Sequence, residues 1–267
     1  MGIMCGEDYG RDESPKSFLE FCGNQTSKSM DTVSHAEIII RAKTFFREEI
    51  VESHLKNVGK SHSLKDYNSN PFLIKYLANF LKGDDTPRSI AEALVYPRLL
   101  GTSINTTFGM KIQKMISQIF EGMGSTTAGM DIEFLDALDG RRKFCQIKSG
   151  PQTINHSDID TILGHFKKAR NLARQNYRDL RIDDFVVGIL YGEDADLSSN
   201  YLGIKNEYPV VIGREFWHRL TGKEDFYYDL INAFGEVAKE TDGRKELEAV
   251  VSKLATEIEQ KFNFDSP

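Results

Sequence analysis

Apolar residues recur at helical spacing through the first 120 residues of the chain. The segment AEIIIRAKTFFREEIVESHLKNV, from about His35, has this spacing. A second helix, PFLIKYLANFLKG, is predicted after Asn70, because proline suits the first turn of a helix. A third, SIAEALVYPRLL, is predicted after Thr86 and Pro87, and a fourth over residues 109–120. This part of the chain should be mainly helical.

The pattern changes at Gly129. MDIEFLDAL and KFCQIKSG are typical of strands, and the β-branched runs DFVVGILYG (184–192) and YPVVIG (208–213) predict buried strands. A long amphipathic helix is predicted over about 157–177, another near Arg214, and residues 226–262 suit a pair of surface or partner-facing helices. This order predicts a mixed sheet flanked by helices, so the fold class is α/β, with α+β as the alternative.

An Asp-Gly pair separates the first two predicted strands and indicates a two-residue hairpin turn at Asp139 and Gly140. That turn would set Glu133 opposite Gln146, and Asp131 opposite Lys148. Side chains alternate along a strand, so these four should share one face. The other face should carry apolar side chains and pack on the core: Ile132, Phe134, Cys145 and Ile147.

Composition limits the classes of protein that need to be considered. The formal net charge of −6 argues against a general polyanion-binding protein, but it allows a local basic cleft. No apolar run approaches the roughly 18 residues that span a bilayer, and the N-terminus lacks the apolar core of a secretory signal, so we expect a cytoplasmic protein without membrane contact. Cys5, Cys22 and Cys145 have no zinc-ligand spacing, which favours reduced thiols.

The shared polar face of the hairpin has two interpretations. It is either an ordinary solvated surface with weak cross-strand ion pairs, or a divalent-metal site. In the second case Asp131 is a hard oxygen ligand for Mg²⁺, helped by Glu133 or by the amide oxygen of Gln146. Lys148 would then hold or deprotonate the attacking water and stabilise the charge that develops on the phosphate.

At these residues the chain resembles the PD-(D/E)XK nuclease superfamily. Asp131 matches the Asp of its motif and Lys148 matches the Lys, while Gln146 stands where the motif has Asp or Glu. The resemblance implies a metal site of Asp131, Gln146 and Ile147, with one fixed charge fewer than usual and Glu133 as a replacement for it. Asp131, Gln146, Lys148 and Glu133 are therefore the predicted catalytic residues.

The resemblance extends from about residue 70 to 240. NPFLIKYLANFL, AEALVYPRLLGTSINTTFG, the block from Asp131 to IKSGPQT, VVGILYG and VIGREFW follow one another as in type II restriction endonucleases that cut interrupted GG-N-CC palindromes. It implies a homodimeric, Mg²⁺-dependent enzyme that breaks both strands of double-stranded DNA, with a cognate DNA methyltransferase gene nearby. The predicted organisation is a poorly ordered leader (1–32), a helical region for DNA binding or dimerisation (33–125), a catalytic core (126–225) and C-terminal helices (226–267).

Two loops are candidate contacts to DNA. SGPQTIN (149–155) follows the second strand, and its Ser149, Gln152 and Asn155 suit phosphate or base edges. A plain loop with a helix N-cap at Asn155 or Ser157 is the alternative. GTSINTTFGMKIQ, which includes Thr106, would offer hydroxyl and backbone donors to phosphate just before a helix.

The predicted helix over 157–177 carries a basic stripe, which binds phosphate or is an ordinary solvated surface: Lys167, Arg170, Arg174 and Arg178. Glu121 is a further candidate for holding or orienting a metal. His156 and His165 lack a Ser or Cys partner and are expected to be structural, and Trp217 to be an anchor in the core or in a dimer interface.

Several functions stay open on this sequence. A site-specific endonuclease is the first. A DNA-binding protein that keeps the nuclease fold with weak or no turnover is the second, because Gln146 removes a carboxylate. A repair-type nuclease, or an unrelated α/β protein with a charged hairpin, are the others.

Overall fold

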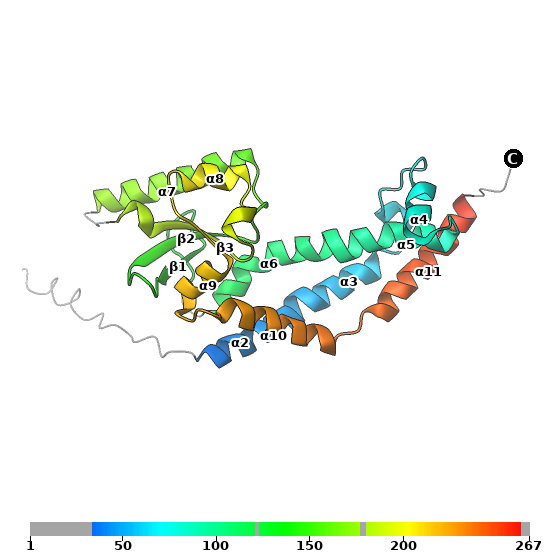
Figure 1. Cartoon of the computed structure of the whole chain (residues 1–267), viewed down its shortest axis with the longest axis horizontal. Helices are drawn as coiled ribbons and strands as arrows, with labels where there is room; N and C mark the ends of the chain where they lie inside the picture. The colour runs from blue at the N-terminus through cyan, green and yellow to red at the C-terminus, as the bar shows by residue number, and fades with distance from the viewer. Residues whose placement is uncertain (1–33, 121–122, 177–179, 263–267) are drawn as a thin grey trace, which may run out of the picture. The chain divides into compact units, whose positions relative to one another are not determined.

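The computed structural model describes residues 34–120, 123–176 and 180–262 (Figure 1). Its centre is a sheet of β1 (Ile132–Leu135), β2 (Arg142–Lys148), β3 (Phe185–Ile189) and β4 (Val210–Ile212), in the order β1-β2-β3-β4. β1 is antiparallel to β2, and the other neighbours are parallel. The predicted mixed sheet is therefore confirmed, with each strand where the sequence predicts it.

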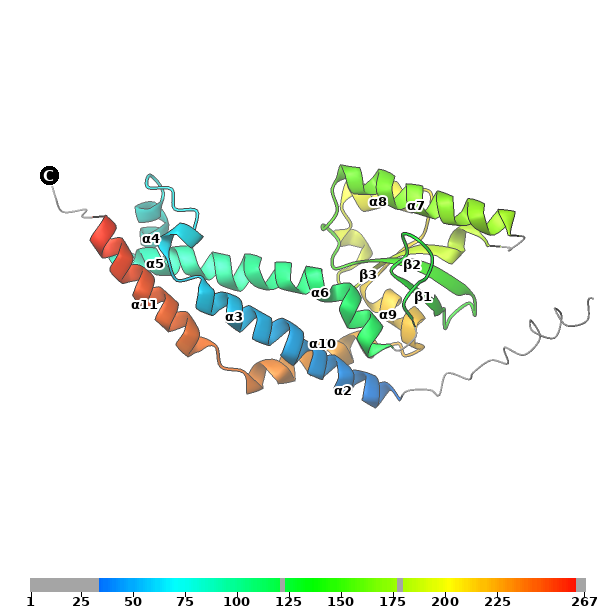
Figure 2. The same cartoon turned by 180° about the vertical axis from the view of Figure 1, so that it is seen from behind.

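Helices cover both faces of the sheet. α7 (His156–Gln175) and α8 (Ser199–Lys205) lie on one face and α9 (Gly213–Thr221) lies on the other (Figure 1 and Figure 2). On the α9 side, a Cβ at Gly188 of β3 would be 2.4 Å from the Phe216 ring, so only glycine allows this helix to approach so closely. Trp217 is buried and donates to the Leu190 carbonyl at 2.9 Å, which makes it a core anchor.

The helices before the sheet form two long runs. The first predicted helix consists of α2 (His35–Phe45), a π-helical segment η1 (Phe46–Val51) and α3 (Glu52–Lys60). The second run is α5 (Pro87–Tyr96), a π-helical segment η3 (Pro97–Ser103) and α6 (Ile104–Ile119). α4 (Ile74–Lys82) precedes α5. Short 3₁₀ turns lie before α4, before β3 and before α8: η2 (Leu64–Asp66), η4 (Ile182–Asp184) and η5 (Asp194–Asp196).

The prediction of a phosphate-binding loop at GTSINTTFG is wrong. Residues 101–109 are helical, because α5 continues through η3 into α6 without a break. Their backbone N–H groups serve the helix, and the hydroxyls of Thr106 and Thr107 donate to the carbonyls of Thr102 and Ser103 at 2.8 and 2.9 Å. No helix N-terminus exists there to bind an anion.

The C-terminal helices pack on the N-terminal ones. α10 (Phe226–Glu240) contacts α2, and α11 (Arg244–Lys261) contacts α3 and α5. Buried side chains of α5 and α11, such as Ile90, Val95, Val251 and Leu254, share one apolar cluster with α4. None of the described helices is long and apolar enough to cross a membrane.

The hairpin between β1 and β2 differs from the predicted two-residue turn. Ile132 lies opposite Cys145, and Glu133 opposite Phe144, two residues earlier in β2 than predicted. The side chain of Asp136 accepts the Leu138 N–H at 2.9 Å and the Arg219 guanidinium at 2.8 Å. Asp136 thereby starts a loop of four residues, 137–140. Because the shift is an even number of residues, each side chain keeps its predicted face.

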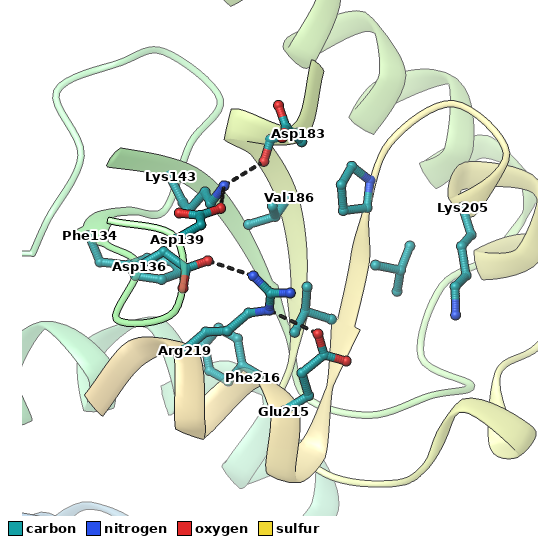
Figure 3. A pocket seen from close by; sticks show the side chains of 13 residues that line it. Phe134, Asp136, Asp139, Lys143, Asp183, Val186, Lys205, Glu215, Phe216 and Arg219 are labelled. Atoms are coloured by element: carbon teal, nitrogen blue, oxygen red, sulfur yellow. Dashed lines mark hydrogen bonds and ion pairs between the residues drawn. The ribbon is translucent and has the colours of Figure 1, made fainter. Parts of the chain in front are cut away.

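The face with Ile132, Phe134, Cys145 and Ile147 is buried as predicted, but it also holds Lys143. The Lys143 ammonium lies 2.6 Å from Asp139 and 3.0 Å from the Asp183 carbonyl (Figure 3). These groups line a cavity of about 280 Å³ with Asp136, Arg219 and Glu215. Arg219 is paired with both of those carboxylates, and Lys143 is paired with Asp139.

Asp184, just before β3, is the buried anion of this charged region. It is 1% exposed and accepts hydrogen bonds from Arg141 Nε at 2.7 Å and from the Arg181 N–H at 2.8 Å. Burial alone would raise the pKa of Asp184, but these donors outweigh burial and hold the pKa below its usual range.

Asp184→Asn should lower the free energy of unfolding by about 3 kcal/mol at pH 7, because Arg141 loses its buried counter-ion. The depressed pKa means that the carboxylate stabilises the fold above the ordinary value of about 4, and that this stabilisation is lost as the pH falls through the lower folded pKa. Urea unfolding from pH 7 to pH 3 should therefore show the two proteins converging at acid pH. Asp194→Asn, in an exposed pair with Lys205, is the control and should cost less than about 1 kcal/mol. Equal losses in both variants would contradict this account of Asp184.

Candidate active site

Asp131 lies at the start of β1, where two neutral donors hold its carboxylate. Oδ1 accepts a hydrogen bond from Gln113 Nε2 of α6, and Oδ2 accepts one from the Ile147 N–H of β2, both at 2.6 Å. Burial raises the pKa of Asp131, and the Ile147 N–H, Lys148 and His165 offset part of this rise. The result is a fixed, largely desolvated carboxylate that a cation would stabilise.

Lys148 ends β2 on the same face as Asp131. Its ammonium makes no hydrogen bond or ion pair with any residue in the described parts of the chain. It is nevertheless close enough for its charge to lower the pKa of Asp131. A half-buried lysine without a fixed partner can donate its N–H groups to a ligand at the same place.

Gln146 is 6% exposed and its amide has a fixed orientation. Nε2 lies 2.5 Å from the Gly129 carbonyl, which can only accept, and 2.9 Å from His165 Nδ1. The nitrogen must therefore face the Gly129 carbonyl, with His165 Nδ1 also within hydrogen-bond distance of it. Oε1 accepts no hydrogen bond from the described residues, so it is open to a ligand.

Glu133 does not stand beside Gln146, because the observed register pairs it with Phe144. Its carboxylate accepts from Ser125 at 2.7 Å and from Thr127 at 2.9 Å, and lies 3.4 Å from Arg142. The prediction that Glu133 lies opposite Gln146 and replaces its missing charge rests on the wrong register. In the structure Glu133 holds the segment before β1.

The donor set fits one hard cation. Among the described residues no cluster of three or more His, Cys, Asp or Glu side chains is arranged to hold a metal ion. The available oxygens are those of Asp131, Oε1 of Gln146 and the backbone carbonyl of Ile147. The N–H and C=O of one residue point to the same edge of a strand, so this carbonyl faces the same side as the Ile147 N–H that Asp131 accepts. Mg²⁺ suits such a site because it keeps several waters and needs few protein ligands.

A groove of about 530 Å³ lies beside the loop that directly follows Lys148. The start of α6 lines it with Asn105 and Phe108, and the loop after β2 lines it with Ser149 and Gln152. Tyr191, after β3, closes another side. The structure thus brings together the two segments in which the sequence places DNA contacts, although one of them is a helix rather than a loop.

Asn155 is the N-cap of α7. Its Oδ1 accepts the Asp158 N–H at 3.2 Å and the Ser157 hydroxyl at 2.6 Å, and the Asp158 side chain caps the Asn155 N–H in return. The alternative of a helix N-cap is confirmed for this residue. Its amide oxygen is therefore already used within the chain.

The predicted basic stripe lies on the surface of α7. Lys167 is 3.1 Å from Glu207, which neutralises it, whereas Arg170 and Arg174 form no ion pair with any described residue. Arg178 and Glu121 fall outside the described residues. Among the described residues of the predicted stripe, the cations left for an external phosphate are therefore Arg170 and Arg174.

Two residues of the site are missed by sequence reasoning. Gln113 binds Asp131 from α6, and His165 of α7, which the sequence predicts to be a structural histidine, contacts Gln146. The periodicity of the sequence does not indicate either contact, because each one joins residues of two separate elements that are 18 or 19 positions apart.

Comparison with known proteins supplies the family. The model of the type II restriction endonuclease EcoO109I family matches residues 36–242, most of the chain. The chain belongs to the EcoO109I family. It is accordingly a DNA-cleaving hydrolase of the type II restriction class, and its α/β fold is consistent with that class. The match includes α2 through to the end of α10 and every residue of the candidate site. No curated protein matches the chain.

Gly129 is essential to the geometry around Gln146. It has a φ of +82°, and an added Cβ would lie 2.5 Å from His165 Cγ. Gly129→Ala should therefore destabilise the fold by about 2 kcal/mol or more, through left-handed strain and the clash with His165. It should also shift the imidazole resonances of His165 in an NMR spectrum. Gly235→Ala, in α10 with open space around it, is the control and should be neutral or stabilising by about 0.5 kcal/mol. An unchanged melting temperature for Gly129→Ala would contradict this assignment.

Proposed function

We propose that the chain is an Mg²⁺-dependent, site-specific endonuclease with a PD-(D/E)XK type site, which breaks both strands of DNA at a short palindrome as a homodimer. The observation that carries this is the partly buried Asp131 carboxylate beside the ammonium of Lys148, which has no ion-pair or hydrogen-bond partner among the described residues, in a chain of a restriction-endonuclease family. A partly desolvated acid next to such a lysine is costly to keep unless a ligand uses both.

Asp131, Oε1 of Gln146 and the Ile147 carbonyl would hold the metal. Mg²⁺ bound there would supply positive charge against the charge that develops on the scissile phosphate. Gln113 and the Ile147 N–H keep the two oxygens of Asp131 in place, and Gly129 keeps the amide of Gln146 in place. Preorganisation of this kind spares the site from rearranging as charge develops.

Lys148 would act on the nucleophile. As an ammonium it would hold the attacking water and donate to a phosphate oxygen, and as the neutral amine it could accept the proton of that water. Proximity to Asp131 keeps the ammonium near the reacting phosphate. Hydrolysis would leave a 5′-phosphate and a 3′-hydroxyl, as the resemblance implies.

The groove beside the site would receive DNA. Ser149 and Gln152 line it, Thr106 lies one residue from its Asn105 wall, and Arg170 and Arg174 of α7 would contact phosphates. A GG-N-CC core, a cytoplasmic location and a cognate methyltransferase gene beside this one remain proposals from the resemblance. Asn155 would contact DNA through its amide nitrogen, since its amide oxygen caps α7.

The second candidate is a DNA-binding protein of the same fold with little or no turnover. The observation that favours it is the neutral amide of Gln146, which leaves Asp131 as the one carboxylate of the site. A plasmid digest separates the candidates: discrete fragments indicate a restriction enzyme, binding without cleavage the inactive protein, and a smear a repair-type nuclease.

Asp131→Ala and Lys148→Ala should each reduce cleavage of plasmid DNA by at least about 1000-fold, because one removes the anchoring carboxylate and the other the water-holding ammonium. Both variants should keep specific DNA binding in Ca²⁺, and EDTA should stop the wild-type protein. Glu236→Ala, an exposed surface acid paired with Lys43, is the control and should cut normally. Wild-type rates for both site variants would show that the site lies elsewhere.

The role of Gln146 can be separated from that of Glu133. Gln146→Glu adds charge to the proposed metal site, so the Mg²⁺ concentration for half-maximal cleavage should fall by roughly 10-fold. Gln146→Leu removes the oxygen and should raise that concentration. Glu133→Ala should lower stability without changing the response to Mg²⁺, because its oxygens hold Ser125 and Thr127. A changed Mg²⁺ response in Glu133→Ala, with none in either Gln146 variant, would reverse the two roles.

A further inference from the structure

The groove beside the loop after Lys148 has one carboxylate and no basic side chain among the described residues that line it. Asp196 of η5 carries that carboxylate, and its side chain is exposed, so a ligand can reach it. It forms no ion pair within the parts of the chain that the structure describes. Asp194, two residues earlier in the same turn, is by contrast paired with Lys205 at 2.7 Å. An uncompensated negative charge therefore lines the groove that, in the proposed function, receives DNA.

The position of Asp196 is fixed by its neighbours. Oδ2 accepts the Glu193 N–H at 2.8 Å, whereas Oδ1 accepts no hydrogen bond from a described residue. Gly192 has a φ of +103°, and an added Cβ there would lie 3.1 Å from Pro151 Cγ, so the segment lies close against the loop after β2. The Ser198 N–H also donates to the Pro151 carbonyl at 3.1 Å. The open oxygen of Asp196 is thus held at a defined place in the groove wall.

The loop on the other side of the groove supplies neutral polar groups. Its backbone is held by the Gly150 carbonyl, which accepts the Thr153 hydroxyl at 2.8 Å and the Tyr201 hydroxyl at 3.2 Å. The side chains of Ser149 and Gln152 line the groove and make no hydrogen bond to any described residue. The groove therefore combines one fixed, charged acceptor with an open hydroxyl and an open amide.

This lining does not suit the phosphates of DNA. A carboxylate accepts hydrogen bonds and cannot donate them, and phosphate oxygens are acceptors as well, so Asp196 repels the DNA backbone. The cations for phosphates lie outside the groove lining, at Lys148 and at Arg170 and Arg174 of α7. Base edges carry N–H donors, and they are the parts of DNA that a carboxylate can bind.

The four bases differ in what they offer a carboxylate in the major groove. Guanine presents two acceptors, and thymine presents an acceptor and a methyl group. Adenine presents an amino group beside the acceptor N7, which would face the carboxylate unfavourably. Cytosine is the one base whose edge has an amino donor and no acceptor, so it is the base that an unpaired carboxylate selects.

We propose that Asp196 recognises a cytosine of the DNA site, by accepting a hydrogen bond from its N4 amino group in the major groove. The inference rests on the proposed function, because it names a base that this groove reads, but binding alone can test it. Repulsion of phosphate and attraction to cytosine act together. Asp196 lowers affinity for DNA of any sequence, and a correctly placed cytosine restores it, so the residue adds selectivity.

Asp196→Asn removes the charge but keeps an oxygen for the Glu193 N–H. The full-length chain in Ca²⁺ should select sites with a fixed cytosine from a random pool of duplex oligonucleotides. Asp196→Asn should lower the preference for that cytosine by roughly 10-fold and keep the preferences at other positions. Its affinity for DNA without the site should rise by roughly 2-fold or more, because a repulsive charge is gone. Asp194→Asn, the same change on a paired neighbour, is the control and should keep the cytosine.

A modified base tests the hydrogen bond itself. In duplex DNA the methyl group of N4-methylcytosine replaces the amino hydrogen that faces the major groove. This base at the selected position should weaken binding by the wild-type chain at least about 10-fold. Asp196→Ala should bind modified and unmodified DNA alike, because it has neither the acceptor nor the bulk. A merely structural role for Asp196 would weaken binding of both DNAs equally and leave their ratio at the wild-type value.

The outcomes separate this inference from the proposed function. Selected sites without a fixed cytosine, or an Asp196→Asn variant with every wild-type preference, overturn the role of Asp196 even if plasmid is cut into discrete fragments. Loss of the cytosine preference in both Asp variants also overturns it, because charge rather than contact then decides. Loss in Asp196→Asn alone supports it even if no plasmid is cut, and only the proposed cleavage then fails. A wild-type chain that selects no sequence overturns both.

Discussion

The hydrogen bond from the Ile147 N–H to the Asp131 carboxylate is the contact on which the arrangement of the site depends. It fixes the start of β1 against the end of β2, next to Lys148, the last residue of that strand. The second oxygen of the same carboxylate is bound by Gln113, so α6 is joined to the sheet through the same group. A carboxylate that is partly buried between neutral donors keeps its position, and added positive charge would stabilise it further. The Asp131 side chain therefore both holds α6 and β2 together and provides the negative charge of the candidate site.

Gln146 contributes a neutral amide, rather than a second negative charge, to the same site as Asp131. A carboxylate there would face the Gly129 carbonyl at the place where Nε2 now donates. The amide satisfies that carbonyl and still offers an oxygen on its other branch. The PD-(D/E)XK motif that the sequence resembles has an acid at this position, whereas the local hydrogen bonds favour an amide, and the structure explains why glutamine is stable there.

Much of the fold could be predicted from the sequence, because the elements follow from local periodicity. The four strands and the helices after them lie where apolar spacing and Gly or Pro boundaries predict them. The register was wrong by two residues because the prediction considered only the turn preference of Asp139 and Gly140. The Asp136 side chain, which binds Leu138 and the remote Arg219, decides the loop instead. Thr106 and its neighbours were expected in a loop because small polar residues favour turns, yet the packing of α5 and α6 keeps them helical. Gln113 and His165 depend on contacts between distant elements, which periodicity does not encode.

The π-helical segment η3 lets the continuous helical run of α5 and α6 pack against different neighbours at its two ends. A π-helical turn holds more residues than an α-helical one, so it rotates every later side chain about the helix axis. Before η3, α5 packs against α4 and α11; after it, α6 packs against α2 and β2. A regular helix would keep a single buried stripe facing one way. The wider turn changes the direction in which the buried side faces, so that one continuous helical run packs first into the α4 and α11 cluster and then against the sheet, where Gln113 binds Asp131.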